Sequence, residues 1–193
     1  MAQDMEQTTP ENVAEIDKTD ATPWYAIKLY TVRQLAVAAY FAEHGLETFI
    51  PEQYVDYEDK EHHIRHELRP VVRNLIFLKK TLPEKEMRKL ITTAPLKMSV
   101  VTKEIGSPAY CEIPAKQMFD FKMMCNPELT MKKILSTEQA HLKKGDKVLV
   151  HHGPLKGLTG RLVRSNKKYY LLKEIPGMAI MVKVSRWCCE AAE

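Results

Sequence analysis

The sequence predicts an α+β protein in two parts, an antiparallel sheet flanked by helices and then a small β-barrel. Between residues 24 and 125, runs of strand formers alternate with helical segments. After residue 143 the pattern changes to short strands at close spacing, with Gly and Pro between them. Hydrophobic residues make up 45% of the chain and charged residues 28%, which is typical of a globular protein.

Composition divides the chain into four segments. Residues 1–22 are polar and acidic, carry too little apolar surface to offset chain entropy, and are predicted to be a disordered acidic tail. Residues 23–125 form the first predicted domain, and residues 143–193 form the second. The polar stretch 126–142, which Pro127 interrupts, is predicted to be a linker.

The first domain is predicted to open with a strand and a helix. Residues 24–30 are rich in strand formers and too short for an isolated helix. Thr31 and Gln34 have the spacing of a capping box, in which each side chain bonds the other residue's backbone N–H. The helix that follows is expected to turn an apolar face of mostly small residues toward the sheet, and Gly45 suits its end. This face comprises Leu35, Ala38, Ala39 and Ala42.

A short, fully apolar run at residues 75–78 is typical of a central strand. Alternation places Leu75 and Phe77 on one face of the sheet and Ile76 and Leu78 on the other. One pair is expected to face the helices, and the other faces either a partner or more of the core. If Leu75 and Phe77 face a partner, at least one of them is expected to be partly exposed in the isolated protein. The remaining elements predicted here are a hairpin over residues 49–58 and 62–68, helices that start at Pro83 and Pro114, and a strand over residues 98–102.

The second domain is predicted to contain short strands at residues 147–151, 161–164, 168–173 and 178–184. Residues 167–170, Lys-Lys-Tyr-Tyr, mix basic and aromatic groups as RNA-binding strands do, and they also fit a solvated strand edge. About fifty residues is near the lower size limit for a domain without disulfides or metals, so a modest core is expected.

Charge is distributed unevenly along the chain. Residues 1–23 carry six acidic residues and one lysine, whereas the chain from Lys143 onward carries eleven Lys/Arg and four Asp/Glu. A basic C-terminal part suits an anionic partner such as nucleic acid, although a solvated basic surface has the same composition.

Several classes of function are not predicted. No apolar run approaches the roughly 18 residues of a membrane span, and the acidic N-terminus is unlike a signal peptide, so a cytoplasmic protein without a membrane partner is expected. No phosphate loop, Gly-x-Ser-x-Gly elbow or paired Cys/His motif occurs, so neither enzyme activity nor a cofactor is expected. The histidines of residues 62–66 are spaced too widely on a strand to hold one ion, so no metal site is predicted. The four cysteines are expected to be free thiols.

Residues 145–162 carry the most specific motif of the chain. Val148 and Val150 alternate inward on a strand, and Gly157 and Gly160 supply backbone freedom where the chain curls into the next strand. The pattern resembles the KOW motif, which occurs in NusG proteins and in several ribosomal proteins. The resemblance implies that the barrel is SH3-like.

The first domain resembles the N-terminal domain of NusG proteins. The resemblance rests on Trp24-Tyr25 at the start of a strand, on Phe49-Ile-Pro51 after the helix, and on residues 68–77, which are similar to the family's signature loop and central strand. It implies a monomeric transcription elongation and antitermination factor that binds the clamp region of RNA polymerase through an apolar concavity on its sheet. The corresponding polymerase-binding positions are Val71, Val72, Asn74, Leu75 and Phe77.

Residues 74–77 resemble those of specialised paralogs of the RfaH and UpxY type, because Val71 and Val72 stand where a housekeeping NusG carries bulky aromatics. This likeness implies action on a polysaccharide (capsule) operon and contact with the non-template DNA strand. The side-chain types at the start of the first helix suit base recognition, although Gln34 has a competing capping role. The candidate nucleic-acid-binding residues are Arg33, Gln34 and Arg73.

The KOW resemblance alone also fits a second function, that of an RNA-binding or ribosome-associated protein that never touches polymerase. In either case the resemblance implies that the barrel contacts a ribosomal protein, a termination factor or RNA. Leu155 and Leu158, which are expected to stay exposed in its loop, are the candidate contact residues. The sequence leaves open which operon and recruitment sequence are used, whether the two domains inhibit each other, and whether the second domain switches fold.

Overall fold

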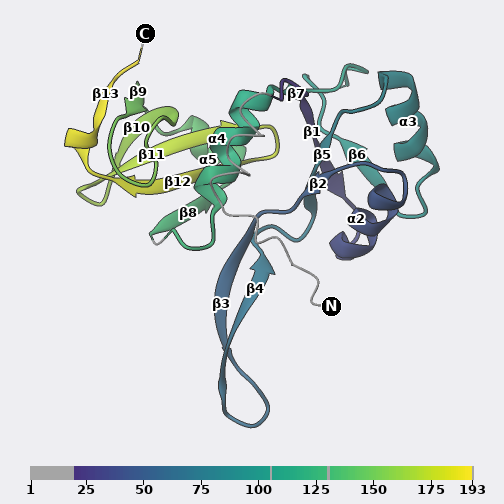
Figure 1. The fold of residues 1–193 in the computed structure, drawn as a ribbon, viewed down its shortest axis with the longest axis horizontal. Coiled ribbons are helices and arrows are strands. Elements are labelled where there is room, and N and C mark those ends of the chain that lie inside the picture. The colour runs from purple at the N-terminus through teal and green to yellow at the C-terminus, as the bar shows by residue number, and fades with distance from the viewer. Residues whose placement is uncertain (1–19, 105, 130, 193) are drawn as a thin grey trace, which may run out of the picture.

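The chain folds into two antiparallel sheets, and a long hairpin projects from the first (Figure 1). The computed structural model describes residues 20–104, 106–129 and 131–192. The predicted acidic tail lies almost entirely outside these residues. Mixed α and β structure with antiparallel sheets was predicted, and it is confirmed.

The first sheet, called here the N-terminal sheet, has the strand order β2-β5-β1-β6, with β7 also paired to β1. The central strands β1 and β5 are antiparallel, and Ala26 lies opposite Phe77 in their register. Apart from Lys28 and Lys79, both strands consist of buried apolar residues, as expected for the middle of a sheet. The strands are β1 (Trp24–Leu29), β2 (Thr48–Phe49), β5 (Leu75–Lys79), β6 (Met98–Val100) and β7 (Glu112–Ile113).

Two helices cover one face of this sheet, α2 (Gln34–Glu43) and α3 (Glu84–Thr93). Ile76 and Leu78 point into this face and share one apolar cluster with the helices. The cluster also holds Tyr25, Ile27, Val37, Phe41, Met87 and Ile91. The alternation predicted for residues 75–78 is therefore confirmed, and this pair faces the helices.

The predicted face of helix α2 was wrong. Val37 and Phe41 are fully buried, whereas Leu35 is 72% exposed. The larger side chains bury more apolar area than the alanines could, and they set the rotation of the helix. The predicted capping box is also absent, because the Thr31 hydroxyl accepts a hydrogen bond from the backbone of Arg33 and the Gln34 side chain bonds other segments.

The projecting hairpin consists of β3 (Glu52–Glu58) and β4 (Ile64–Pro70), which pair only with each other. Figure 1 shows it extending away from both sheets. Pro51 interrupts the run that was predicted as one strand, so β2 stays in the sheet while β3 leaves it. Most hairpin side chains are exposed, among them Ile64 at 80%.

The second sheet, called here the C-terminal sheet, has the order β13-β9-β10-β11-β12-β8. A small SH3-like β-barrel was predicted, but among the described strands no pairing joins β13 to β8, so the sheet is not a closed barrel. The strands are β8 (Lys132–Leu135), β9 (Asp146–Val150), β10 (Thr159–Ser165), β11 (Lys168–Ile175), β12 (Met178–Val184) and β13 (Cys189–Ala191), and a short 3-10 turn, η1 (Arg186–Cys188), precedes the last.

The stretch predicted as a linker contains regular structure. Strand β8 pairs with β12 at the end of the C-terminal sheet. Helix α5 (Thr137–His141) begins with a capping box between Ser136 and Gln139, and its Ala140 is buried against the sheet face that carries Tyr170 and Leu172.

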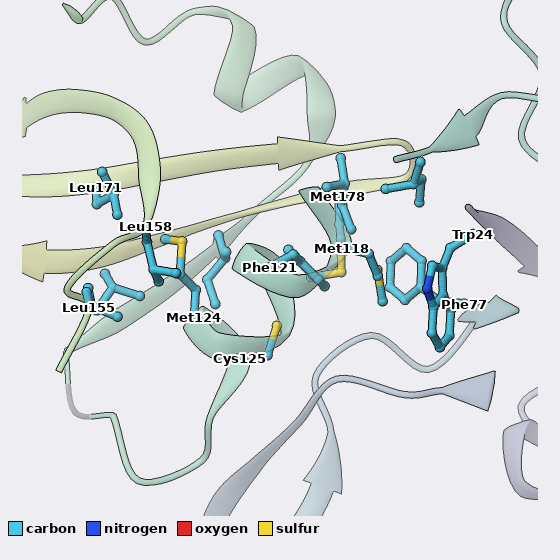
Figure 2. Packing of buried hydrophobic residues seen from close by; sticks show 14 of the residues in the cluster. Trp24, Phe77, Met118, Phe121, Met124, Cys125, Leu155, Leu158, Leu171 and Met178 are labelled. Atoms are coloured by element: carbon cyan, nitrogen blue, oxygen red, sulfur yellow. The ribbon is translucent and has the colours of Figure 1, made fainter. Parts of the chain in front are cut away.

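Helix α4 (Ala115–Cys125) joins the two sheets in space (Figures 1 and 2). It contacts β11 and β12 on one side. Its Phe121 ring packs against Phe77 of the N-terminal sheet on the other side, 5.4 Å between centroids. One continuous apolar cluster therefore runs from Trp24 through α4 to Leu171 of the C-terminal sheet (Figure 2).

Two glycines of the predicted motif are needed for different reasons. Gly157 has a φ of +85°, which side chains rarely adopt. Gly160 has no positive φ, but a Cβ there would lie 2.7 Å from the Leu172 carbonyl oxygen on the neighbouring strand. The first residue therefore supplies a turn, and the second permits a close approach of backbones.

Candidate functional site

The second face of the N-terminal sheet carries Leu75 and Phe77. Partial exposure was expected for at least one of them, and this was wrong, because Leu75 is 5% exposed and Phe77 is fully buried. Phe77 lies among aromatic rings, with Phe121 of α4 at 5.4 Å and Phe49 of β2 at 6.3 Å between centroids. Figure 2 shows α4 between this face and the C-terminal sheet.

Leu75 is covered by the C-terminal sheet itself. The turn between β11 and β12 brings Gly177 so close that a Cβ on it would lie 3.0 Å from a methyl carbon of Leu75. The same Cβ would lie 3.7 Å from the Cβ of Ala26. The absence of a side chain at this turn, together with a φ of +92°, lets the backbone rest directly on the N-terminal sheet.

A cleft of about 820 Å³ opens beside this contact, between the two sheets. Val72, Asn74 and Leu75 line its N-terminal side, so three of the five predicted polymerase-binding residues meet there. Val71 does not line the cleft, and its backbone N–H donates to the Pro51 carbonyl at 2.9 Å. Lysine side chains line the wall of the cleft that belongs to the N-terminal part, and glutamate side chains line the wall that belongs to the C-terminal part. These charged groups are Lys28 and Lys103 on the first, and Glu138 and Glu174 on the second.

A buried ionic contact fastens α4 to the C-terminal sheet. Asp120 is fully buried, and its two carboxylate oxygens accept hydrogen bonds from Lys116 of its own helix and from Lys173 of β11, at 2.9 and 2.8 Å. The Thr159 hydroxyl adds a third hydrogen bond at 3.2 Å. The side chain of Lys173 is only 11% exposed, so most of this network is removed from water.

A different set of charges fastens α4 to the N-terminal sheet. The Lys122 ammonium lies 4.2 Å from the centre of the Trp24 ring and 3.3 Å from the Glu47 carboxylate. Burial disfavours the charged form of Glu47, but Lys79 and Lys122 outweigh that cost and lower its pKa. At the end of the helix, burial raises the pKa of the Cys125 thiol to about 12, which makes this cysteine unreactive.

The predicted nucleic-acid residues fall into two classes. Gln34 is buried, and its amide donates to the carbonyl oxygens of Val72 and Leu75 at 2.7 and 2.6 Å. It therefore connects the start of α2 to the segment that leads into β5, and its amide N–H groups are used in these bonds. Arg33 and Arg73 are exposed. Arg33 directly precedes Gln34, and Arg73 lies between the two residues that Gln34 bonds.

Sequence reasoning missed three exposed apolar side chains beside Arg33. Tyr30 is 59% exposed, Val32 is 78% exposed and Leu35 is 72% exposed. When Val37 and Phe41 are buried, helical geometry places Leu35 on the exposed side of α2. The larger size of the apolar residues Val37 and Phe41 was the signal in the sequence that could have predicted this rotation.

Leu155 and Leu158 were expected to stay exposed, and this was wrong, because each is 3% exposed. Gly157 N–H donates to the Val150 carbonyl and Val150 N–H donates to the Leu158 carbonyl, which folds the loop back onto β9. In this position both leucines join the apolar cluster around Met124 of α4 (Figure 2).

The hairpin tip brings possible metal ligands together, although no metal site was predicted. Ligand atoms of Asp59, Glu61 and His63 lie within 4.8 Å of one another. The Asp59 carboxylate already accepts hydrogen bonds from the backbone N–H groups of Glu61 and His63 and from the Arg65 side chain. This residue therefore has a complete structural role in closing the turn.

Comparison with protein families finds a match to the model described as transcription termination factor NusG, over residues 22–122. The match runs from β1 into α4, including the face with Leu75 and Phe77. A comparison with curated proteins returns no match. No helix in the described part of the chain is long and apolar enough to cross a membrane.

Proposed function

The chain belongs to the NusG family of transcription factors, and we propose that it acts in transcription elongation and antitermination by binding RNA polymerase through its N-terminal sheet. The surface proposed is the face that carries Val72, Asn74, Leu75 and Phe77. The observation that supports it most is how this face is covered. Its own helices α2 and α3 lie on the other face, and the C-terminal sheet supplies much of its cover.

An apolar sheet face of this kind needs a partner whenever the C-terminal sheet is not on it. A pair of polymerase helices, as in the clamp region, would replace the C-terminal turn around Gly177 and enter from the open cleft. Val72 and Leu75 would then supply apolar contact, and Asn74 would lie at the polar rim. The proposed antitermination effect is that a factor bound to the clamp holds it closed against the opening that accompanies pausing.

The finer assignment we propose is a specialised paralog that acts on a polysaccharide operon. Arg33 and Arg73 would contact the non-template DNA strand, because they are exposed cations on neighbouring segments that Gln34 holds together. The C-terminal sheet would serve as a KOW module that contacts a second macromolecule, namely a ribosomal protein, a termination factor or RNA. Leu155 and Leu158 could take part only after α4 leaves them, since both are buried under it.

Binding of purified RNA polymerase to the full chain tests the proposed face. Val72 lines the cleft and is half-buried, so Val72→Asp places a charge on the docking surface. Because Val72 also packs against the apolar cluster, circular dichroism is used to verify that the variant is folded. Loss of an interface anchor commonly costs about 2 kcal/mol, so binding should weaken at least about ten-fold. The matched control is Leu142→Asp, at a side chain that is 84% exposed, and it should bind as the wild type does. Equal affinity of a folded Val72→Asp variant would refute the assignment of this face.

The second candidate function is an RNA-binding or ribosome-associated protein that does not touch polymerase. The basic charge of the chain from residue 143 onward favours it. Capture on the tagged full chain separates the two functions, because polymerase subunits should be enriched under the first and ribosomal RNA under the second. The Val72→Asp variant should lose only the polymerase subunits.

A further inference from the structure

A groove of about 870 Å³ opens on the C-terminal sheet, and neither the family match nor the proposed polymerase contact involves it. Its floor is apolar and comes from three different strands. Two aromatic side chains stand at the groove, Tyr169 from β11 and Trp187 from the short turn before β13. The apolar floor residues are Val148, Leu162 and Val184.

Trp187 is the most exposed aromatic side chain in the described part of the chain, at 76%. Its ring lies beside His152, 5.7 Å between centroids and tilted by 34°, so one edge is supported while most of the indole faces solvent. Leaving so large an apolar ring in water forgoes the burial energy that it would contribute in a core. An exposed, supported indole next to an apolar groove is therefore well placed to stack on a planar partner.

The arginine side chains at the groove have no carboxylate partner among the described residues. The chain has eight arginines, and four of them pair with carboxylates: Arg65, Arg69, Arg88 and Arg161. Among the described residues, Arg164 and Arg186 have no such pair. Arg186 lines the groove, and the Arg164 guanidinium lies 5.8 Å over the Tyr169 ring. Lys167, in the adjoining turn between β10 and β11, and Lys168, the first residue of β11, are also exposed, and the described residues give neither of them an ion pair. Asp146 is the one acidic residue of the lining.

We propose that this groove binds single-stranded nucleic acid, with bases stacked on Trp187 and Tyr169 and phosphates held by Arg164 and Arg186. Single strands present both features that the groove matches, because every base has a flat π face and every step has a phosphate. A duplex keeps its bases stacked on each other and cannot offer them to the indole. A peptide would use the aromatic groups, but it would leave the two arginines unneutralised unless it were acidic.

This inference gives the C-terminal sheet of the proposed factor a defined ligand. It does not depend on polymerase binding by the N-terminal sheet, so either proposal can fail alone. The test is fluorescence anisotropy with the full chain and labelled oligonucleotides of about twelve nucleotides, a length within the usual range of single-strand sites. All proteins carry Arg33→Ala and Arg73→Ala, so that the exposed arginines of the N-terminal part do not contribute. Single-stranded RNA, single-stranded DNA of the same sequence and a duplex are compared.

Trp187→Ala should weaken single-strand binding about ten-fold, as expected for the loss of one stacked base, and Trp187→Phe should restore most of it. Arg164→Ala combined with Arg186→Ala should lower the slope of log affinity against log salt by about 1.4, since each lost phosphate contact contributes about 0.7 on a single strand. The charge-matched control, Lys85→Ala with Lys89→Ala on α3, should leave affinity and slope unchanged.

Tighter binding of RNA than of DNA identifies a transcript as the ligand, and the reverse identifies a displaced DNA strand; both support the groove. The proposal is overturned if Trp187→Ala binds single strands as well as its parent does. It is also overturned if the duplex binds as tightly as the single strands, or if an acidic peptide binds the groove and single strands do not. Unchanged thermal unfolding of each variant shows that the fold is intact, because the mutated side chains are exposed.

Discussion

The two faces of the N-terminal sheet are covered in different ways. On one face, α2 and α3 bury Ile76 and Leu78 in an apolar cluster, and the buried polar groups beside it, the Gln34 amide and the Tyr25 hydroxyl, include no carboxylate or ammonium. On the other face, α4 and the C-terminal sheet bury Leu75 and Phe77, and this second cover includes the carboxylate of Asp120, which is fully removed from water.

The difference indicates which cover can be removed. An apolar contact between helix and sheet becomes more stable as the apolar area that it buries increases. It contains no contribution that favours separation. Bringing Asp120 and Lys173 out of water costs several kcal/mol per charge before their attraction is counted, so a buried ion pair contributes little net stability while it fixes one arrangement. The helix face is therefore expected to be permanent, and the other face separable.

The largest expected effect lies on the permanent face. Phe41→Ala removes a fully buried ring and should lower the free energy of unfolding by about 3–5 kcal/mol. The control on the same helix is Leu35→Ala, at a side chain that is 72% exposed, where the change should stay within about 0.5 kcal/mol. Urea denaturation followed by circular dichroism measures both. Similar losses for the two variants would mean that α2 is rotated differently.

The separable face should respond to the loss of its ionic contact. Asp120→Ala leaves Lys173 with neither its carboxylate partner nor water, so we expect a loss of about 3 kcal/mol. Lys116→Ala removes the other ammonium, whose side chain is 66% exposed, and should cost less than about 1 kcal/mol.

A double variant distinguishes an unpaired charge from lost packing. Asp120→Leu combined with Lys173→Met should recover most of the stability that Asp120→Ala loses, because no buried charge remains. If the double variant is as unstable as the single one in thermal unfolding, the contact stabilises the arrangement in some way other than ion pairing.

The smallest effect concerns the contact of α4 with the N-terminal sheet. The pKa of Glu47 is lowered in the folded chain, so its ionised form adds stability above the unfolded value of about 4.3, and this contribution is lost as the pH falls through the lower folded value. The side chain is 48% exposed, and solvent screening keeps the contribution below about 1 kcal/mol. Glu47→Gln should lower the melting temperature slightly at pH 7 and by less at pH 3. An equal difference at both values would exclude the carboxylate as the cause.

Two segments with the same local pattern show what the sequence could predict. Thr31-Val-Arg-Gln34 and Ser136-Thr-Glu-Gln139 both have the spacing of a capping box. Only the second forms one, with the Ser136 hydroxyl accepting from the Gln139 backbone and the Gln139 side chain accepting in return. In the first, burial places the Gln34 amide beside two carbonyl groups of a distant turn, and tertiary contact replaces the local bonds.

The same limit applies to the candidate site. Alternation predicted that Leu75 and Phe77 share a face, because the side-chain period of a strand is a local property. Their cover could not be predicted, since it depends on contacts such as the one between Asp120 and Lys173, which are 53 residues apart. Strand β8 was missed for a related reason. Its Lys132 and Lys133 look like linker residues until β12 is placed beside them.

A disulfide across the separable cover tests most directly whether the face with Leu75 binds polymerase. The Cβ of Ala26 and a Cβ built on Gly177 lie 3.7 Å apart, within the range of about 3.5–4.5 Å that a disulfide requires. A cysteine at Gly177 is strained, because the φ there is +92° and its Cβ would lie 3.0 Å from a methyl carbon of Leu75. Ala26→Cys with Gly177→Cys, in a chain whose Cys111, Cys188 and Cys189 are replaced by serine, should therefore hold the C-terminal sheet in place only when the disulfide has formed. Mass spectrometry verifies the bond, and purified RNA polymerase is the binding partner. We predict that the oxidised chain binds at least about ten-fold more weakly than the same chain after reduction, because the anchors around Leu75 stay covered. Equal affinity of the oxidised and reduced forms would contradict the proposal that polymerase binds this face.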